Sequence, residues 1–340
     1  MSSSSLPAFD DLPEVLGMPQ GCAWGVFDKD GKKDIFGTLN LLTPEVVKSA
    51  YAEAKDGISI SLNWSLGAIS TPGFLRKGLV HKVIALAKTP LACHGFDEEI
   101  EFNTQCSSQW DSLVHFNHQP TASGYNGSKP TVDELTQSFG QFDREQTIPT
   151  LDHWHSRGGI VGRGVFVDYK RWADLNSIKY SPFEDKRITT KEIEVIAKAQ
   201  GLEFKEGDIF IIRTGFTEAL DGLDAEQQAS ALNSHTTCGV EGTKEVAKWF
   251  WNHHFAAVAG DAIAFEAYPA LVDGKAGVVA DLVLHQYFLA LFGMPIGELW
   301  DLKALSDHCA KTGRYTFLLT SSPLNVHGSV GGPPNALALF

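Results

Sequence analysis

The stretch from Gln105 to Phe116 reads Gln-Cys-Ser-Ser-Gln-Trp-Asp-Ser-Leu-Val-His-Phe and places two carboxamides, a carboxylate and an imidazole close together. Gln109 and Asp111 are two residues apart, so on an extended strand their side chains project from the same face. Gln105 precedes Gln109 by four residues, which fits the same repeat. The stretch therefore predicts a strand that lines a polar pocket, with His115 just beyond it. Such a pocket suits either a metal ion or a polar substrate.

Outside this stretch, strand-like and helix-like segments alternate along the chain. Thr43 and Pro44 predict the start of a helix that runs to about Lys55, because threonine can cap a helix and proline fits its first position. The continuous apolar run at 208–214 is typical of a strand covered on both faces. Further strands are expected at 58–62, 98–104, 160–169, 255–259 and 315–320, and further helices from 131 and at 190–200, 224–232, 242–252, 280–292 and 301–311. The Gly/Pro-rich residues 328–335 predict a rigid loop.

This alternation predicts the fold class, a single α/β domain built on a mixed β-sheet flanked by helices. Residues 1–35 are predicted to form an N-terminal extended arm, which a helix follows, and residues 36–340 to form the α/β domain. We find no internal repeat and no low-complexity linker.

Charge and composition exclude several classes of function. The 340 residues include 28 basic and 41 acidic side chains, a formal net charge of −13. Nucleic-acid and anionic-membrane surfaces need clustered Lys and Arg, so neither partner is expected. The N-terminus lacks a secretory pattern, no apolar run is long enough for a transmembrane helix, and the five scattered cysteines are typical of reduced thiols. We therefore expect a cytoplasmic protein with a small-molecule substrate.

Four titratable residues are candidates for chemistry. Asp111, His115, His285 and Glu298 could form a divalent-metal site or an acid/base pair. A plainer interpretation stays open, in which His285 is a hydrogen-bonded core residue and Glu298 lies on the surface. The sequence has no nucleophile elbow, no Walker loop and no dinucleotide-binding glycine pattern, so serine hydrolases, nucleotide hydrolases and Rossmann dehydrogenases are not supported.

The chain resembles the cyclase family that contains bacterial kynurenine formamidase and isatin hydrolase. The resemblance extends from the run 36–44, Phe-Gly-Thr-Leu-Asn-Leu-Leu-Thr-Pro, to the run 331–338, Gly-Gly-Pro-Pro-Asn-Ala-Leu-Ala. The family signature is His-x-Gly-Thr-His-x-Asp-x-x-x-His, to which this sequence contributes Gln105, Gln109, Asp111 and His115. A second family element, a helix histidine followed about a dozen residues later by a glutamate, matches His285 and Glu298.

The resemblance implies the family's swivelling β/β/α fold, a homodimer or homotetramer, and roles for individual residues. The implied metal ligands are Gln105, Gln109, Asp111, His285 and Glu298, and the implied catalytic residues are His115, Glu298 and Asp111. Trp110, Gln105, Gln109, His118 and Tyr125 are the candidate substrate contacts. Glutamine replaces both histidine ligands of the signature, and a carboxamide oxygen is a weak, hard donor. Mn²⁺ or Mg²⁺ is therefore expected in preference to Zn²⁺, if a divalent metal is bound.

Three functions remain open. The first is a metal-dependent hydrolase of a cyclic amide, a lactone or an N-formyl amide, in which His115 moves the proton. The second is a metal-free lyase or isomerase of secondary metabolism, a dehydratase or ring-closing enzyme, in which the two glutamines bind the substrate. The third is a non-catalytic binding protein on the same fold.

Overall fold

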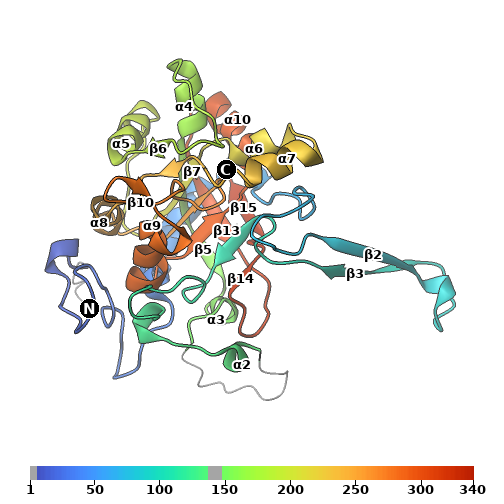
Figure 1. Ribbon diagram of the computed structural model, residues 1–340, viewed down its shortest axis with the longest axis horizontal. Helices are drawn as coiled ribbons and strands as arrows, with labels where there is room; N and C mark the ends of the chain where they lie inside the picture. Colours follow the sequence, from blue (N-terminus) through green and yellow to red (C-terminus); the bar gives the residue numbers. More distant parts are fainter. Residues whose placement is uncertain (1–5, 137–147) are drawn as a thin grey trace.

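A nine-stranded mixed sheet forms the centre of the protein in the computed structural model, which describes residues 6–136 and 148–340 (Figure 1). Residues 1–5 of the predicted arm lie outside this range. The strand order is β1 (Ser59–Ser61), β15 (Ala336–Leu339), β13 (Thr316–Ser321), β5 (Ile160–Asp168), β7 (Ile209–Arg213), β9 (Ala257–Gly260), β12 (Ile296–Glu298), β4 (Gln109–Asp111) and β14 (Gly331–Gly332). Strands β5, β7, β9 and β12 run parallel, and the other neighbours pair antiparallel. The predicted mixed α/β sheet is confirmed.

Both faces of the sheet are buried. Along β7, Phe210 and Ile212 enter one apolar core, and Ile209 and Ile211 enter the other. Helices α5 (Thr190–Ala199) and α8 (Lys244–Asn252) pack into the first core, and α3 (Asp152–Ser156) and α10 (Lys303–Thr312) into the second. The prediction that 208–214 is a strand covered on both faces is therefore correct.

Most of the remaining helices fall in predicted segments with shifted ends, but those at 169–175 and 216–221 were not predicted, and neither was α3. The remaining helices are α1 (Pro44–Ala50), α2 (Val132–Leu135), α4 (Tyr169–Leu175), α6 (Phe216–Asp221), α7 (Ala225–Leu232) and α9 (Val283–His285). Thr43 caps α1, since its hydroxyl accepts a hydrogen bond from Val46 N at 3.3 Å. The helix predicted at 280–292 consists of the 3-10 turn η6 (Val279–Asp281), α9 and a π-helical segment, η7 (Gln286–Phe292). No described helix is long and apolar enough to cross a membrane.

Two sequence predictions are wrong in part. Only Gln109–Asp111 of the opening stretch is a strand, because the chain turns between Asn103 and Cys106, whose backbone N donates to the Asn103 carbonyl at 3.0 Å. The tail at 328–335 is not entirely a loop, since β14 pairs with β4. Strand β12 was not foreseen either. Strands of two or three residues are too short to show an alternating pattern.

The N-terminal arm packs against the domain. It contains a 3-10 turn, η1 (Phe9–Asp11), and Phe9 is fully buried with its ring centroid 6.1 Å from that of Phe292. Phe9 N also donates to Asn252 Oδ1 at 2.8 Å. The arm is therefore part of the first core.

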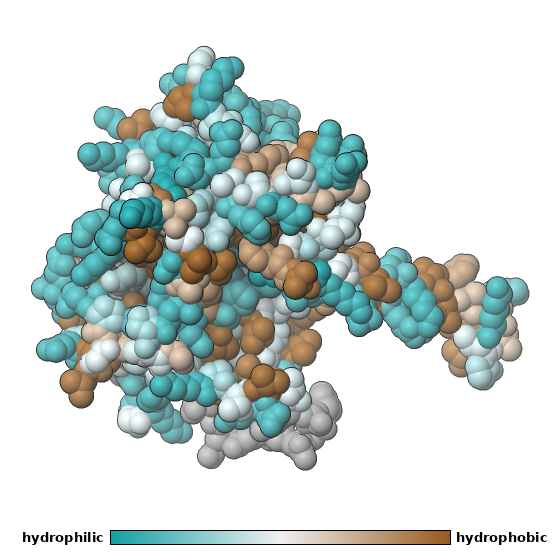
Figure 2. Space-filling view, viewed as in Figure 1, coloured by the Kyte–Doolittle hydropathy of each residue, from teal (hydrophilic) through white to brown (hydrophobic). Residues whose placement is uncertain are grey.

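A two-stranded hairpin projects from the body of the protein, formed by β2 (Val80–Ala85) and β3 (Phe96–Glu101) (Figure 1). Apolar side chains are exposed along it, as Figure 2 shows, with Val83 58%, Phe96 78% and Ile100 47% exposed. The other short pairs are β6 (Arg187–Ile188) with β8 (Gly239–Val240) and β10 (Leu271–Val272) with β11 (Lys275–Ala276). The 3-10 turns not yet named are η2 (Gly37–Leu41), η3 (Tyr51–Glu53), η4 (Leu86–Lys88) and η5 (Tyr125–Gly127).

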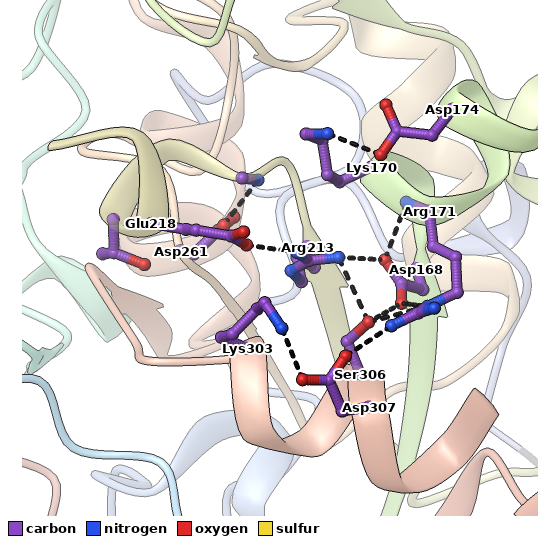
Figure 3. A network of polar contacts seen from close by, with 12 residues as sticks. Asp168, Lys170, Arg171, Asp174, Arg213, Glu218, Asp261, Lys303, Ser306 and Asp307 are labelled. Atoms are coloured by element: carbon purple, nitrogen blue, oxygen red, sulfur yellow. Dashed lines mark hydrogen bonds and ion pairs between the residues drawn. The ribbon is translucent and has the colours of Figure 1, made fainter. Parts of the chain in front are cut away.

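Buried charges hold the carboxyl ends of the parallel strands together (Figure 3). Asp168 ends β5 and accepts a hydrogen bond from Arg213 at the end of β7 at 2.9 Å. Its second oxygen accepts from the Ser306 hydroxyl on α10. Asp261, just after β9, accepts from the backbone N of Thr214, Gly215 and Phe216 at 2.6–3.1 Å and so caps the start of α6.

Asp168→Ala is expected to lower the free energy of unfolding by about 3–5 kcal/mol, because it leaves the Arg213 charge buried beside a vacated partner. Asp174→Ala is the control: Asp174 pairs with Lys170 on the surface and is 59% exposed. The control should cost less than about 0.5 kcal/mol. Urea unfolding followed by circular dichroism measures both variants, and equal losses would contradict the importance of the buried pair.

Candidate active site

The antiparallel pairing of β4 with β12 creates the site. Glu298 lies directly opposite Gln109, and Ile296 lies opposite Asp111. Residues that face each other across a ladder share one face of the sheet, so Gln109, Asp111 and Glu298 project together. Trp110 lies between the two polar residues and projects from the opposite face.

A continuous chain of hydrogen bonds links the polar side chains on this face. Gln105 Nε2 donates to Asp111 Oδ1 at 2.5 Å, and Gln109 Nε2 donates both to Gln105 Oε1 at 3.0 Å and to Glu298 Oε2 at 2.7 Å. Gln105 reaches the strand residues from the preceding turn. The two glutamines therefore act as neutral donors to the two carboxylates.

His285 stands between two carboxylates. Its Nδ1 lies 2.9 Å from Glu266 Oε1, and its Nε2 lies 3.2 Å from Glu298 Oε1. Glu266 also accepts the backbone N–H groups of Val283 and Leu284 at 3.0 Å and of His285 at 2.8 Å, at the start of α9. A carboxylate at a helix N-terminus is favourable, so Glu266 fixes both the helix and the imidazole.

The surroundings change the pKa of three of these groups. Burial alone lowers the pKa of His285, but its hydrogen bonds to Glu266 and Glu298 outweigh burial and raise it to about 10. Burial, with the nearby Asp111 carboxylate, raises the pKa of Glu298 to about 7, although His285 opposes this rise. Burial lowers the pKa of His115, against the opposing effect of Asp111. At neutral pH His115 is therefore neutral and His285 is an imidazolium.

His115 lies at the edge of this cluster. Its Nε2 is 3.8 Å from Asp111 Oδ1, and its side chain is 22% exposed. It is thus close to the carboxylate without a direct hydrogen bond, and it remains accessible from the cavity that adjoins the cluster. A neutral imidazole in this position can accept a proton from a bound molecule.

A cavity of about 170 Å³ opens onto the cluster. Gln105, His115, His285 and Glu298 lie at its polar side. The apolar lining includes Phe74, Phe116, Phe216, Ile263 and Leu282. An apolar cavity with a few convergent polar groups is the usual form of a small-molecule site.

Of the five predicted substrate contacts, Gln105 lines this cavity, Gln109 lies buried in the cluster behind it, and the other three do not line it. Trp110 is fully buried in the second core, where its ring packs edge-on against Trp300 at 4.9 Å, because it faces away from Gln109 and Asp111. Tyr125 is also fully buried, and its hydroxyl lies 3.1 Å from Asp34 Oδ2. His118 hydrogen-bonds the Thr121 hydroxyl at 2.9 Å. None of these three side chains is positioned to contact a substrate in the cavity.

Two residues of the site were not foreseen. Glu266 is fully buried under His285, and Arg76 lines the cavity. Neither stands in a motif, and each reaches the site from a distant part of the chain. An acidic residue 19 positions before the helix histidine is no signal by itself, so only the fold could identify Glu266.

The residues fit a hard divalent cation. Asp111, His285 and Glu298 each offer a ligand atom, all within 4.8 Å of one another. Asp111 Oδ2 and Gln109 Oε1 are buried acceptors that have no hydrogen-bond partner in the described part of the chain. Such acceptors are costly and are satisfied by a donor or a cation. Gln105 differs, since its oxygen already accepts a hydrogen bond from Gln109.

Comparisons with known proteins agree with the fold. A family model described as putative cyclase matches residues 39–267. The structure resembles a crystal structure of a novel cyclase at 28% identity and a TM-score of 0.76, covering 94% of this chain and 99% of that chain.

More distant structures share the fold alone. Isatin hydrolase A from Labrenzia aggregata, bound to benzyl benzoate, has 13% identity and a TM-score of 0.56, covering 86% of this chain and 97% of its own. An isatin hydrolase bound to the product analogue thioisatinate has 11% identity and a TM-score of 0.58, covering 88% and 99%. No match was found among curated protein sequences.

Glu266→Ala is expected to destabilise the protein by about 3 kcal/mol, because the buried Leu284 and His285 N–H groups and the imidazole lose their acceptor. The exposed Glu184, changed to Ala, is the control and should stay within about 0.5 kcal/mol of wild type. Denaturant unfolding gives both values. A loss for Glu266→Ala no larger than the control would show that Glu266 does not hold α9.

Proposed function

Because the chain belongs to the putative cyclase family, we propose that it is an enzyme that hydrolyses a cyclic amide, a lactone or an N-formyl amide. The observation that supports this most directly is that His115 and Glu298 line one side of an apolar cavity, with the buried Asp111 carboxylate close behind them. Hydrolysis needs a base for water, an acceptor that orients the water and a proton source for the leaving group, and these residue types supply all three.

His115 is the proton carrier in this proposal. It is neutral at neutral pH and accessible from the cavity, so it can take a proton from the attacking water. The same imidazole then gives the proton to the leaving nitrogen or oxygen. Asp111 lies 3.8 Å away, where its charge stabilises the imidazolium that forms in between.

Asp111 and Glu298 orient the water. Asp111 Oδ2 has no donor in the described part of the chain and can accept a hydrogen of the attacking molecule. Glu298 is held by Gln109 and His285, so its carboxylate has a defined direction toward the cavity. A side chain that two partners already hold loses little conformational freedom when the substrate binds.

A divalent cation has a place in this site. Asp111 and Glu298, with the oxygen of Gln109 and with His285 once it has lost its Nε2 proton, would hold it, and the donor set of mostly oxygens fits Mn²⁺ or Mg²⁺. When bound, such a cation supplies Lewis acidity that polarises a carbonyl and makes water more acidic.

One observation favours the second candidate, a metal-free lyase or isomerase. The amide nitrogens of Gln105 and Gln109 donate to the carboxylates of Asp111 and Glu298, and the His285 imidazolium lies against Glu298 and Glu266. The carboxylates are thus partly compensated by the protein itself. In that reaction His115 and Glu298 would act as acid and base on the substrate.

His115→Ala is expected to lower kcat about 10²- to 10⁴-fold with little change in KM, because a general acid/base group typically contributes this much. A panel of cyclic amides, lactones and N-formyl amides, followed by product chromatography, measures the loss. His118→Ala is the matched control from the same loop, since His118 does not line the cavity. Equal effects of the two substitutions would contradict the role of His115.

Metal content separates the two candidates. Protein purified without chelator should contain about one equivalent of Mn²⁺ or Mg²⁺, and Asp111→Asn should lower that content, because the site loses a charged ligand. Elemental analysis before and after dialysis against EDTA, with activity assayed in parallel, tests this. A metal content below about a tenth of an equivalent, together with full activity in EDTA, would contradict the metal-dependent hydrolase and favour the lyase or isomerase.

A further inference from the structure

We infer that Arg76 binds a carboxylate on the substrate, so that the substrate class is an apolar carboxylic acid that also carries the bond to be cleaved. The inference rests on the proposed function, because it names the kind of molecule that the same cavity takes.

Arg76 lines the cavity together with His115, His285 and Glu298. Its guanidinium lies over the ring of Phe74, 5.2 Å from the centroid. In the described part of the chain no protein group accepts a hydrogen bond from this guanidinium, nor does any carboxylate form an ion pair with it. Stacking on a ring leaves the N–H edge of an arginine free to bind an anion.

The other arginines of the described residues all have protein partners. They hydrogen-bond carbonyls or carboxylates, and they are Arg157, Arg163, Arg171, Arg187, Arg213 and Arg314. Arg76 is the exception, and it is also the only arginine or lysine among the described residues of the cavity lining. A half-buried guanidinium that faces an apolar cavity loses hydration without a compensating partner, which favours an anionic ligand.

The backbone places Arg76 at this position. Phe74 and Leu75 both have left-handed conformations, with φ of 57° and 58°, which non-glycine residues adopt only at a cost. The next residue, Lys77, fixes the chain on the other side through its backbone, because its carbonyl accepts from Asn103 N at 2.9 Å. Asn103 is two residues from Gln105, so this contact ties Arg76 to the polar cluster.

The charges in the cavity give the substrate a direction. Asp111 and Glu298 repel an anionic group, and Arg76 attracts it through a planar fork that matches a carboxylate. The carboxylate of the substrate therefore binds at Arg76, and apolar residues such as Phe116 and Phe216 contact its hydrocarbon part. The reactive carbonyl is then left on the side of His115 and Glu298.

Binding of a matched pair of probes tests this. Benzoate and its neutral counterpart benzamide are titrated by calorimetry into wild type, Arg76→Met and Lys77→Met. Methionine keeps an unbranched chain against Phe74 and removes the charge. Lys77 is the matched control, since it carries the neighbouring charge and pairs with Glu101 on the surface.

Arg76→Met should weaken benzoate binding about 10- to 100-fold, the loss of a charge-assisted contact, and should leave benzamide binding unchanged. Lys77→Met should change neither. Equal losses for both probes, no loss for benzoate, or no preference of wild type for benzoate would each overturn the inference.

The binding result is independent of turnover. If no amide or lactone is hydrolysed but benzoate binding depends on Arg76 as expected, the proposed hydrolase fails and the anion site stands. If hydrolysis is found but benzoate binding does not depend on Arg76, the function stands and the inference on the substrate class fails.

Discussion

The site depends on the pairing of two three-residue strands, β4 and β12. This pairing places Gln109 opposite Glu298 and brings residues that are 189 positions apart to 2.7 Å. Gly297 allows it, because a Cβ at that position would lie 2.8 Å from the Ala259 Cβ and from the Trp300 indole nitrogen. A slip of one residue in register would turn Gln109 and Asp111 toward the second core and Trp110 toward the cavity. The chemistry of the site is therefore set by sheet packing.

The two glutamines change the electrostatics of the site relative to the signature that the sequence resembles. Histidine ligands there would present nitrogen lone pairs, whereas Gln105 and Gln109 present N–H groups to Asp111 and Glu298. These donors stabilise the carboxylates without adding charge. Among the described residues, the only cationic side chain in contact with Glu298 is His285, whose other ring nitrogen lies against Glu266. Negative charge is thus concentrated at one side of the cavity, and Arg76 lies in the same lining.

Sequence patterns were sufficient for the larger elements and for the core of the site. The buried run at 208–214, the capped helix after Thr43 and the common face of Gln109 and Asp111 all depend on local physical rules, and each is present. Trp110 follows the same alternation, which places it on the opposite face from Asp111. Glu266 and Arg76 could not be predicted, since their roles arise from contacts between distant segments. The short strands β12 and β14 were missed because tertiary packing, not local pattern, makes them extended.

The contrast between buried carboxylates on different strands of the sheet supports the assignment of the site. At the ends of β5 and β9, Asp168 and Asp261 use both carboxylate oxygens in hydrogen bonds to the protein (Figure 3). Asp111, on β4, is equally buried, yet its Oδ2 has no partner among the described residues. The same sheet satisfies the buried carboxylates of Asp168 and Asp261 completely. One oxygen of Asp111 is left without a hydrogen bond in the described part of the chain, next to residues that line the cavity. The missing partner is most simply a ligand, because a purely structural carboxylate gains nothing from an unpaired oxygen.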